Sequence, residues 1–558
     1  MSSATKPQNG KVSEQSKPSP PAGRRSGTRR DVLHLSLLTL LLGGVSYASQ
    51  FIQHPLFGKT LSASWFRVGA FVSIVLGRLA LPDSDKSRSN ALRAAAFVLV
   101  TGSIYSRALG VWASENLSDP ALAPLVGHAA FGFLALALGG GVWVQLVRNF
   151  TERESEVTKL GHYVFIAFSC FASANCIHYI DRIIGELISW LTNITAKMLA
   201  VNVGISLYML ASTINPPTSS TRPTGLEPSS ALSLIPVVMA LIAIVANPLK
   251  FDPPTGFSIL SQTQSTTGLI QVVDNNAANR PSRIIRSDSS TLGAAFLAYD
   301  KMPETVAGNT MDPTSVLQEA VRMVTEPKGS KALVIGTGTG YITSSLIGHG
   351  FNTTLIEKDR AVYDAARQHF GLPEPNALHI TDPAQWVWNQ SPSADKFDVV
   401  ALNLFAGSEL IMSLAGVEFW QSLVPIMNEP GVVSIRFAAK TQPPFLIKSL
   451  FHTLLSVFGT CRVYHANSID VNQLESDGVV DFVAFCTPGA TLTSQSEDTL
   501  KIFAKREIDI AAVLGESVRE RYIMKDNDGR LQRWGKEIAV ENWKAVRKTV
   551  PAGVWYAY

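Results

Sequence analysis

The hydrophobic and polar positions follow two different patterns along the 558 residues of the chain. Long apolar runs dominate the first half, and most reach the roughly 20 residues that a helix needs to cross about 30 Å of hydrocarbon. These runs lie near 32–50, 62–81, 92–113, 121–147, 160–179, 196–213 and 231–247. The last run is short, and Asp181, Arg182 and Glu186 interrupt the region 180–213. The pattern predicts a multi-span α-helical membrane domain over 31–250, with six to eight spans.

The second half of the chain has a different pattern of apolar and polar residues. From about residue 251 onward, short apolar runs alternate with polar, turn-rich stretches, which predicts a soluble α/β domain over 251–497. A polar helical tail is expected over 498–558. Residues 1–30 are rich in Ser, Pro, Gly and basic residues and have almost nothing to bury, so they predict a disordered basic arm.

Composition agrees with a membrane protein. Charged residues make up 16% of the chain and hydrophobic residues 46%, whereas an ordinary soluble domain has about 25% charged residues. The net charge of +4 is small and concentrated in the N-terminal arm, which excludes nucleic acid as an expected partner. The four cysteines, Cys170, Cys176, Cys461 and Cys486, show no CxxC spacing and are expected to be buried free thiols.

A glycine-rich loop follows an apolar strand in "KALVIGTGTGY", where Gly336, Gly338 and Gly340 succeed the strand Ala332–Ile335. Glycines allow a tight turn and let a ligand approach the backbone closely. A dinucleotide fingerprint, GxGxxG, would place its third glycine where this chain has Tyr341. The GxGxG spacing instead indicates a class I S-adenosylmethionine-dependent fold.

Polar residues end the strands that follow the loop. The strand in "NTTLIEKD" ends at Glu357, whose carboxylate suits the two hydroxyls of a ribose, and "NALHITD" ends at Asp382, which suits an adenine amino group. A further strand, "FDVVALNLF", ends at Asn403. Ligands bind at the carboxyl ends of strands in open parallel sheets. Gly336, Gly338, Gly340, Glu357 and Asp382 are therefore the expected cofactor-binding residues.

Over roughly 265–488 the sequence resembles the spermidine synthase-like (polyamine aminopropyltransferase-like) branch of the methyltransferase fold. The resembling segments, in order, are "TTGLIQVVDN", "SRIIRSDSSTLGAAF", "SVLQEAVRMV", the glycine strand, "FDVVALNLFAG", "GVVSIRFAAK", "IKSLFHTLLSVFGTCRVYHA" and "GVVDFVAFCTP". The resemblance implies a Rossmann-like α/β domain preceded by a small β-hairpin region. It also implies that the cofactor is S-adenosylmethionine or its decarboxylated form.

Four positions depart from the family pattern. The family has an acid where this chain has Thr339, and its Tyr-Gln pair appears as Leu317-Gln318. Its catalytic strand ends in Asp with another Asp three residues later, and these positions hold Asn403 and Ala406. Because deprotonating a polyamine amine needs a base within hydrogen-bond reach, these losses argue against spermidine synthesis.

Methyl transfer fits the remaining groups better, because it depends mostly on aligning donor and acceptor. Asn403 is a candidate for orienting an acceptor through its amide. Asp288, in the turn "RSDSS", and Gln318, which the resemblance carries over, are the other catalytic candidates. Each also has a plain structural interpretation: a strand-end residue, a turn aspartate and a helix residue.

The membrane region raises a separate hypothesis. His128, His162 and His178 lie in or near apolar spans, where ionisable residues are often functional. No HxxxH spacing supports a haem or metal site, so no metal ligand is assigned. Small residues in "GFLALALGGG", 132–141, predict close helix packing.

Positive residues predict the orientation. They cluster in the N-terminal arm, around Lys86 to Arg93 and around Arg148 to Lys159, which places the N-terminus in the cytoplasm. Seven spans would then put the α/β domain outside, where S-adenosylmethionine is scarce and where the sequons at Asn352 and Asn389 would matter. An even number of spans and a cytosolic domain are therefore expected.

The sequence as a whole predicts a membrane-anchored transferase that moves a methyl group to a small or membrane-associated acceptor. The alternative is a catalytically degenerate domain that regulates or stabilises a membrane protein, and a polyamine aminopropyltransferase is the third candidate. Transport by the spans has no direct support. Expected partners are the acceptor and the lipid bilayer, and a homodimer is left open.

Overall fold

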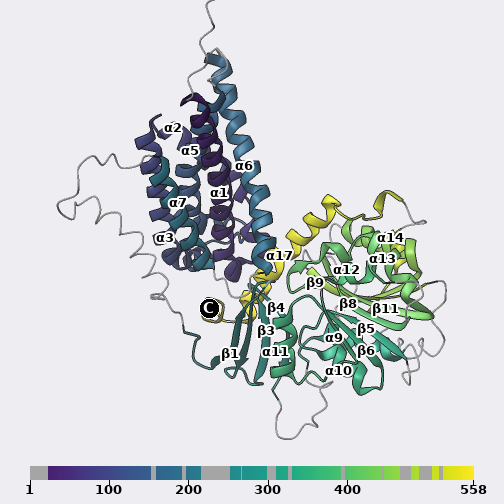
Figure 1. Ribbon diagram of the computed structural model, residues 1–558. Helices are drawn as coiled ribbons and strands as arrows, with labels where there is room; N and C mark the ends of the chain where they lie inside the picture. Colours follow the sequence, from purple (N-terminus) through teal and green to yellow (C-terminus); the bar gives the residue numbers. More distant parts are fainter. Residues whose placement is uncertain are drawn as a thin grey trace, which may run out of the picture.

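The computed structural model describes residues 23–151, 159–190, 196–214, 252–265, 267–297, 310–323, 330–390, 396–440, 445–465, 479–488, 506–514 and 520–557. An elongated helix bundle stands on one end of a mixed α/β region (Figure 1). The predicted run 231–247, the arm before residue 23 and the loop 215–251 lie outside the described residues.

The bundle contains helices α1 (Gly23–Ser62), α2 (Phe66–Ala80), α3 (Asp85–Asn116), α4 (Ala123–Ala130), α5 (Gly132–Thr151), α6 (Lys159–Trp190) and α7 (Ala196–Ile214). Small residues let these helices approach one another, as predicted for 132–141. A Cβ added to Gly77 of α2 would lie 1.7 Å from the carbonyl oxygen of Ala137 in α5, and one added to Gly140 would lie 2.6 Å from Ile74. The two backbones therefore touch.

Three described helices are long and apolar enough to cross a membrane by length and composition: Arg30–Ser62, Asp85–Asn116 and Lys197–Ile214. Helices α4 and α5, which were expected as one run over 121–147, meet at a bend of 55° and together would make a fourth. The predicted total of six to eight spans stays a prediction.

Helix α1 connects the two ends of the bundle. Near its start, Arg30 contacts the carbonyl oxygen of Thr213, and His34 Nε2 lies 3.3 Å from Thr213 Oγ1. Near its end, the carbonyl oxygen of Leu56 accepts the Trp543 indole N–H at 2.9 Å. The α/β region therefore lies at the end of α1 opposite the N-terminal arm. The expectation that the N-terminus and the α/β domain share the cytosolic side stays a prediction, and this arrangement disfavours it if α1 crosses a membrane.

The large sheet has the order β14-β12-β13-β11-β8-β5-β6-β7. Its strands are β5 (Lys331–Ile335), β6 (Asn352–Glu357), β7 (Ala377–Ile380), β8 (Phe397–Asn403), β11 (Met427–Lys440), β12 (Gly459–His465), β13 (Val479–Pro488) and β14 (Glu507–Ile508). The strands β11, β8, β5, β6 and β7 pair in parallel, whereas β13, β12 and β14 are antiparallel to their neighbours. This topology confirms the predicted Rossmann-like fold and its order of strand, helix, strand, strand after residue 431.

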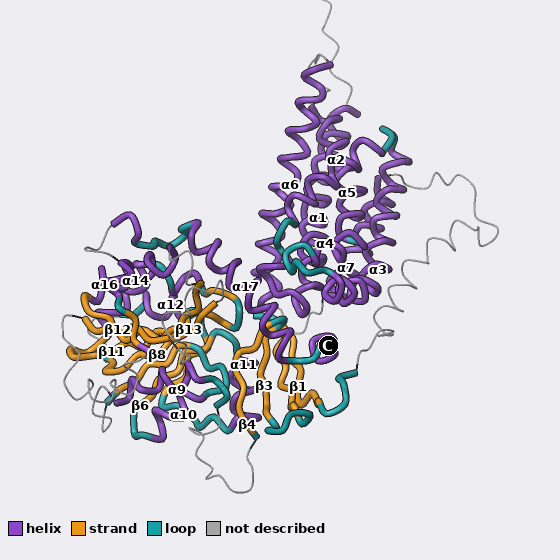
Figure 2. Tube along the Cα trace, turned by 180° about the vertical axis from the view of Figure 1, so that it is seen from behind, coloured by secondary structure: helices purple, strands orange, loops and turns teal. Residues whose placement is uncertain are grey.

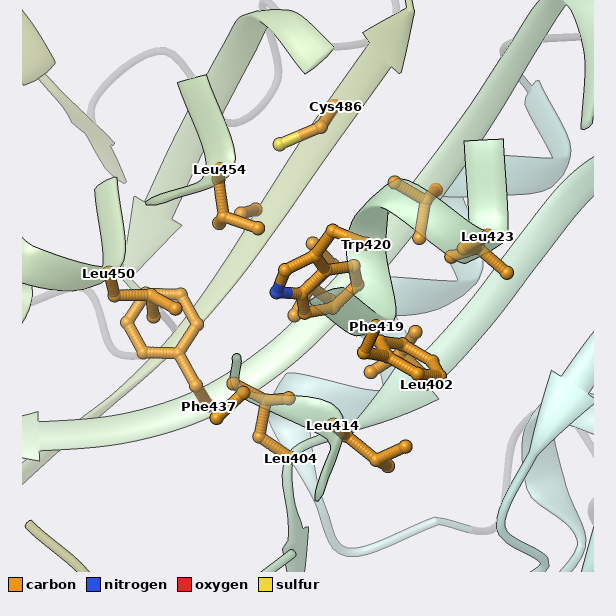
Figure 3. Close-up of a cluster of buried hydrophobic side chains, with 14 of the residues drawn as sticks. Leu402, Leu404, Leu414, Phe419, Trp420, Leu423, Phe437, Leu450, Leu454 and Cys486 are labelled. Atoms are coloured by element: carbon orange, nitrogen blue, oxygen red, sulfur yellow. The ribbon is translucent and has the colours of Figure 1, made fainter. Parts of the chain in front are cut away.

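Helices cover both faces of this sheet because side chains alternate along each strand. They are α9 (Pro313–Glu319), α10 (Tyr341–Gly348), α11 (Arg360–Phe370), α12 (Pro383–Trp388), α13 (Val417–Leu423), α14 (Phe445–Phe458) and α16 (Ile510–Leu514). Val334 packs in one cluster with Leu346 of α10. Its neighbour Leu333 packs in another with Phe419 of α13. In that second cluster Trp420 lies among Leu402, Phe437 and Leu454, fully buried (Figure 3).

A second, smaller sheet joins this domain to the bundle (Figure 2). It is antiparallel in the order β1 (Phe257–Gln264), β2 (Leu269–Asn275), β3 (Ser282–Ser287) and β4 (Ser290–Phe296), larger than the expected hairpin. Helices α17 (Gly529–Thr549) and α18 (Ala552–Tyr556) of the tail pack beside it. The tail was expected to be polar, but its apolar face is buried: Trp534, Trp543 and Trp555 are at most 7% exposed.

Three of the four cysteines differ from the predicted buried free thiols. Cys461 of β12 and Cys486 of β13 stand opposite each other in the antiparallel pair and form a disulfide. The spacing of 25 residues gives no local signal, because the pairing depends on strand register. Cys170 is a buried free thiol as expected, whereas Cys176 is free and exposed.

Candidate functional site

The glycine loop connects β5 to α10 at the carboxyl edge of the parallel strands. Gly336, Gly338 and Gly340 all have positive φ, at 92°, 53° and 82°, so the backbone takes a path that other residues adopt only with strain. A Cβ added to Gly336 would meet no atom within 4 Å. The backbone at Gly336 therefore faces open space, as a ligand cradle requires, whereas Gly340 packs against Leu372.

Glu357 ends the next strand, β6, as predicted. Its Oε2 accepts the backbone N–H of Thr337 in the glycine loop at 2.7 Å, and its Oε1 accepts that of Asp359 at 2.9 Å. Burial raises the pKa of this carboxyl, although the two N–H bonds oppose the rise. Each carboxylate oxygen keeps a lone pair, so the group can still accept the hydroxyls of a ribose.

Asp382 lies at the end of the following strand and caps α12. Its Oδ1 accepts the N–H of Ala384 at 3.1 Å, and its Oδ2 lies 2.8 Å from Lys358 Nζ. Burial alone would raise the pKa of Asp382, but Lys358 and the backbone N–H groups outweigh it, and the pKa is lowered. The residue is a fixed anion beside the glycine loop.

All of these groups except Gly340 line one cavity of about 1780 Å³. The three catalytic candidates, Asp288, Gln318 and Asn403, line it as well. Residues from the helix bundle form another part of its wall, among them His54, Lys59, Trp65, Phe66 and Arg67. The predicted site residues are therefore brought together, in a cavity at the junction of the bundle and the α/β domain.

Asp288 is the catalytic candidate that can titrate, and its pKa is shifted. It occupies a turn between β3 and β4 with φ of 49°, and its Oδ1 accepts the N–H of Leu269 at 2.8 Å. Its side chain is buried at the cavity wall, and this burial raises its pKa to about 6. An acid with this pKa can hold or release a proton near neutral pH.

The side chains of the other two candidates, Asn403 and Gln318, form hydrogen bonds with the backbone. Asn403 Oδ1 accepts the N–H of Phe405 at 3.0 Å, so the amide NH₂ is the group that it can offer an acceptor. Gln318 donates from Nε2 to the carbonyl oxygens of Leu402 and Ser434, at 2.9 and 3.2 Å. These bonds tie α9 to β8 and β11, which is a structural role, and a catalytic part for Gln318 stays a prediction.

The positions that depart from the family pattern lie at the cavity or in the adjoining core. Thr339 and Ala406 line the cavity, and Leu317 is fully buried in the core cluster that contains Val334. No carboxylate therefore replaces the missing acids at these positions. The nearby acid Asp312, which caps α9, is paired with Arg436.

The contacts made by the bundle were not predicted from the sequence. Thr60, near the end of α1, donates its backbone N–H to Glu409 Oε1 at 3.2 Å, and its hydroxyl bonds the other carboxylate oxygen. Glu409 belongs to β10 (Glu409–Leu410), which pairs with β9 (Phe405–Ala406). Lys536 of the tail lies 5.7 Å from the ring of Trp65. These residues are hundreds of positions apart, so no local pattern marks them.

The histidines of the bundle do not form a metal site among the described residues, where no group of three His, Cys, Asp or Glu side chains is suited to a metal ion. His128 is fully buried, with Nδ1 2.8 Å from Ser49 Oγ and Nε2 2.9 Å from the carbonyl oxygen of Ser62. It is a hydrogen-bonded packing residue. His178 contacts Arg67 at the cavity wall, and the side chain of His162 lies outside the described part.

No family model matches the chain. Among curated proteins, it is 30% identical over 331 residues to an N-terminal histidine N-methyltransferase of Emericella nidulans, covering 54% of this chain and 58% of the relative. It is 29% identical over 158 residues to a polyamine aminopropyltransferase of Caldicellulosiruptor bescii, covering 26% of this chain and 54% of the relative. The chain thus spans little more than half the length of these relatives.

Solved structures include a probable spermidine synthase from Corynebacterium glutamicum, at 14% identity and a TM-score of 0.37, covering 50% of this chain and 98% of that one. Another is the N-methyltransferase NodS from Bradyrhizobium japonicum with S-adenosyl-L-homocysteine, at 14% identity and a TM-score of 0.23, covering 31% and 86%. The curated relatives are transferases, in agreement with the predicted enzyme class and its S-adenosylmethionine-type cofactor.

Proposed function

We propose that the chain is a membrane-anchored, S-adenosylmethionine-dependent methyltransferase whose acceptor is the N-terminal histidine of a peptide or protein. The observation that carries the proposal is the cavity itself, which joins an intact nucleoside edge to an acidic acceptor end without the carboxylates of a polyamine site. The histidine specificity is taken from the relative of Emericella nidulans.

The glycine loop, Glu357 and Asp382 are the groups that would hold the cofactor. The loop offers backbone beside open space, Glu357 offers lone pairs for the ribose, and Asp382 suits the adenine amino group. When bound, S-adenosylmethionine supplies a methyl group on a sulfonium that a nucleophile can displace. The protein's part in such a displacement is to hold the acceptor in line and to exclude water.

The chemistry of histidine explains why a strong base is not needed. An imidazole has an ordinary pKa near 6.5, so it is largely neutral and nucleophilic at pH 7, unlike a polyamine amine, which resembles the side chain of lysine with a pKa near 10.4. Asn403 can then orient the acceptor where the family has Asp. Asp288, with a pKa of about 6, can receive the proton that the imidazole loses.

The acidic groups of the cavity suit a peptide N-terminus. Asp288 and Glu409 both line it, and an α-amino group carries a positive charge through much of the neutral range. The aromatic side chains of Trp65 and Phe66 line the bundle side of the cavity, where they can contact the imidazole ring of the acceptor histidine or the next residues of the acceptor peptide. The acids that the resembling family places at the polyamine end are replaced in this cavity by Thr339, Asn403 and Ala406.

The test uses the full-length protein in detergent with a peptide that begins with histidine. Matched peptides begin with alanine or carry an acetylated N-terminal histidine, and mass spectrometry records the added methyl group. We expect methylation of the first peptide alone. Replacing Glu357 by Gln should weaken S-adenosylmethionine binding at least tenfold, since hydrogen bonds to a charged group contribute about 1.5–3 kcal/mol.

The surface variant Asp364→Asn is the matched control, because Asp364 only pairs with Arg360 on the exposed face of α11. It should leave cofactor binding unchanged. A folded wild-type protein that binds no S-adenosylmethionine would favour the degenerate scaffold instead. Preference for the decarboxylated cofactor with a polyamine acceptor would favour aminopropyl transfer.

A further inference from the structure

We propose that the α/β domain lies in a non-cytosolic compartment, across the membrane from the N-terminal arm, and that Asn352 and Asn389 are N-glycosylation sites. The inference does not depend on which reaction the domain performs, but together with the proposed function it requires that S-adenosylmethionine be supplied on the non-cytosolic side of the membrane. It depends on the direction of two helices, the distribution of basic residues, a disulfide and the position of two exposed asparagines.

Two helices run in parallel from the arm's end of the bundle to the domain. Helix α3 begins beside the end of α7, where Ser89 Oγ donates to the carbonyl oxygen of Ala211 at 2.9 Å. In the N-terminal part of α1, Arg30 contacts the carbonyl oxygen of Thr213 in the same segment. Helix α3 ends at the tail, where Ser114 Oγ lies 2.9 Å from the Tyr556 hydroxyl. Both helices are candidate spans, so the arm and the domain lie on opposite faces of the membrane.

Basic residues mark the arm's end as cytosolic. Arg148 of α5 pairs with Asp83 at 2.7 Å in the connection between α2 and α3, and Arg88 follows that connection. The basic residues at the start of α1, in and after the connection between α2 and α3, and at the end of α5 therefore lie at one end of the bundle. The connections 63–65 and 117–122 at the domain end contain no Lys or Arg. Lys59 and Arg67 flank the first connection but line the cavity. An excess of Lys and Arg in short loops is typical of the cytosolic side.

The disulfide between Cys461 and Cys486 agrees with this orientation. It links two neighbouring strands within the α/β domain. Disulfides form and persist in oxidising compartments and are rare in the cytosol, where thiols are kept reduced. The bond therefore places the domain, and not the arm, on the oxidising side.

Asn352 and Asn389 begin the sequons Asn-Thr-Thr and Asn-Gln-Ser, and both side chains are exposed. Asn352 opens β6, whose other end is Glu357, and Asn389 follows α12, whose first turn is capped by Asp382. Each asparagine thus lies at the end of its element remote from the cofactor edge. A glycan at either position would leave the cavity open.

The experiment expresses the full chain in a eukaryotic host that glycosylates secretory proteins. The variants are Asn352→Gln, Asn389→Gln and the pair together, with Lys11→Thr as the matched control, because it creates a sequon at Asn9 in the arm. We expect a glycosidase-sensitive mobility shift that each single variant reduces by one glycan and the double variant by two. Lys11→Thr should add no glycan. Comparing thermal unfolding of each variant with wild type checks that the variants fold.

Protease treatment of sealed microsomes tests the sidedness independently of glycosylation. The α/β domain should be protected until detergent is added, and an epitope in the arm should be digested without detergent. A domain that is digested in sealed microsomes, or a glycan on Asn9, would overturn the proposed orientation. A protected domain without glycan at either asparagine would overturn the assignment of Asn352 and Asn389.

Discussion

At the scale of single residues, the cofactor side of the site could be predicted and the bundle side could not. Gly336, Glu357 and Asp382 follow strands within 50 residues of one another, so the parallel-sheet rule brings them to one edge. Thr60 and Glu409 meet across 349 positions, and only the folded chain pairs them. Asp288 was recognised as a turn residue, but its burial depends on the bundle and tail around it.

Asp288 gives a prediction about pH. Its pKa rises to about 6 in the folded protein from an ordinary value of 3.8, so between these values the folded state holds more protons than the unfolded state. Stability then falls as the pH rises through this window. Asp288→Asn should flatten that dependence and raise the melting temperature at pH 7, by up to the equivalent of roughly 3 kcal/mol.

The measurement is thermal unfolding of the detergent-solubilised protein at pH 4, 5, 6 and 7. Asp288→Asn can still accept the N–H of Leu269, whereas Asp288→Ala cannot, so the alanine variant should be less stable than the asparagine variant. Parallel melting curves for wild type and Asp288→Asn at every pH would contradict a raised pKa. If Asp288 receives the acceptor's proton, the Asn variant also loses methyl transfer.

At the scale of elements, hydropathy identified most helices of the bundle but not their breaks. The run 121–147 contains the break between α4 and α5, because Phe131 leaves helical geometry where Gly132 begins the next helix. Alternation and strand order identified the α/β elements well, since each strand lies close in sequence to its covering helix. The tail contains a helix that is polar on average, as predicted, but this average hides an apolar face with buried tryptophans.

Gly58, at the kink near the end of α1, is expected to tolerate substitution poorly. Gly58 has φ of 76° and ψ of 171°, a conformation open almost only to glycine, and an added Cβ would lie 2.9 Å from Ser289 Oγ and 3.0 Å from Glu409 Oε1. Gly58→Ala should destabilise the protein by about 1–3 kcal/mol and lower activity, because it moves a wall of the cavity. Gly529→Ala, with ordinary backbone and open space, should change the melting temperature little. Equal melting temperatures for the two variants would refute the argument.

The pairing of Thr60 with Glu409 predicts energetic coupling between the bundle and β10. Thr60→Val removes the hydroxyl donor but keeps the side-chain shape, and Glu409→Gln removes the charge. A double-mutant cycle on melting temperature and on the KM for the acceptor should give a coupling of about 0.5–3 kcal/mol. Additive effects of the two substitutions would mean that this contact does not hold the bundle to the domain.

At the scale of the whole molecule, the bundle and the α/β region share a hydrophobic core. Leu56 and Phe57 of α1 and Val111 of α3 are buried with Trp543 of α17 and Trp555 of α18. The sequence shows two halves of different hydropathy, and this contrast hides the shared core. The helices of the bundle therefore complete both the core and the cavity of the α/β region.

This shared core predicts that the domain is incomplete without the bundle. A fragment of residues 252–558 should expose the apolar face of α17 and associate with itself or with detergent, as size-exclusion chromatography can show. Replacing Trp543 by Gln in the fragment should reduce that association, whereas in the full chain it should destabilise the junction. A monodisperse fragment with wild-type thermal stability would contradict the prediction.

The position of α17 and α18 also sets an order of assembly. These helices are synthesised after both the bundle and the sheets, yet their side chains fill the space between them, with the carbonyl oxygen of Ala557 accepting Gln271 Nε2 at 2.7 Å. During translation the helix bundle and the α/β sheets are therefore completed before the helices that join them. Docking of α17 and α18 at the junction would be the step that first closes the cavity.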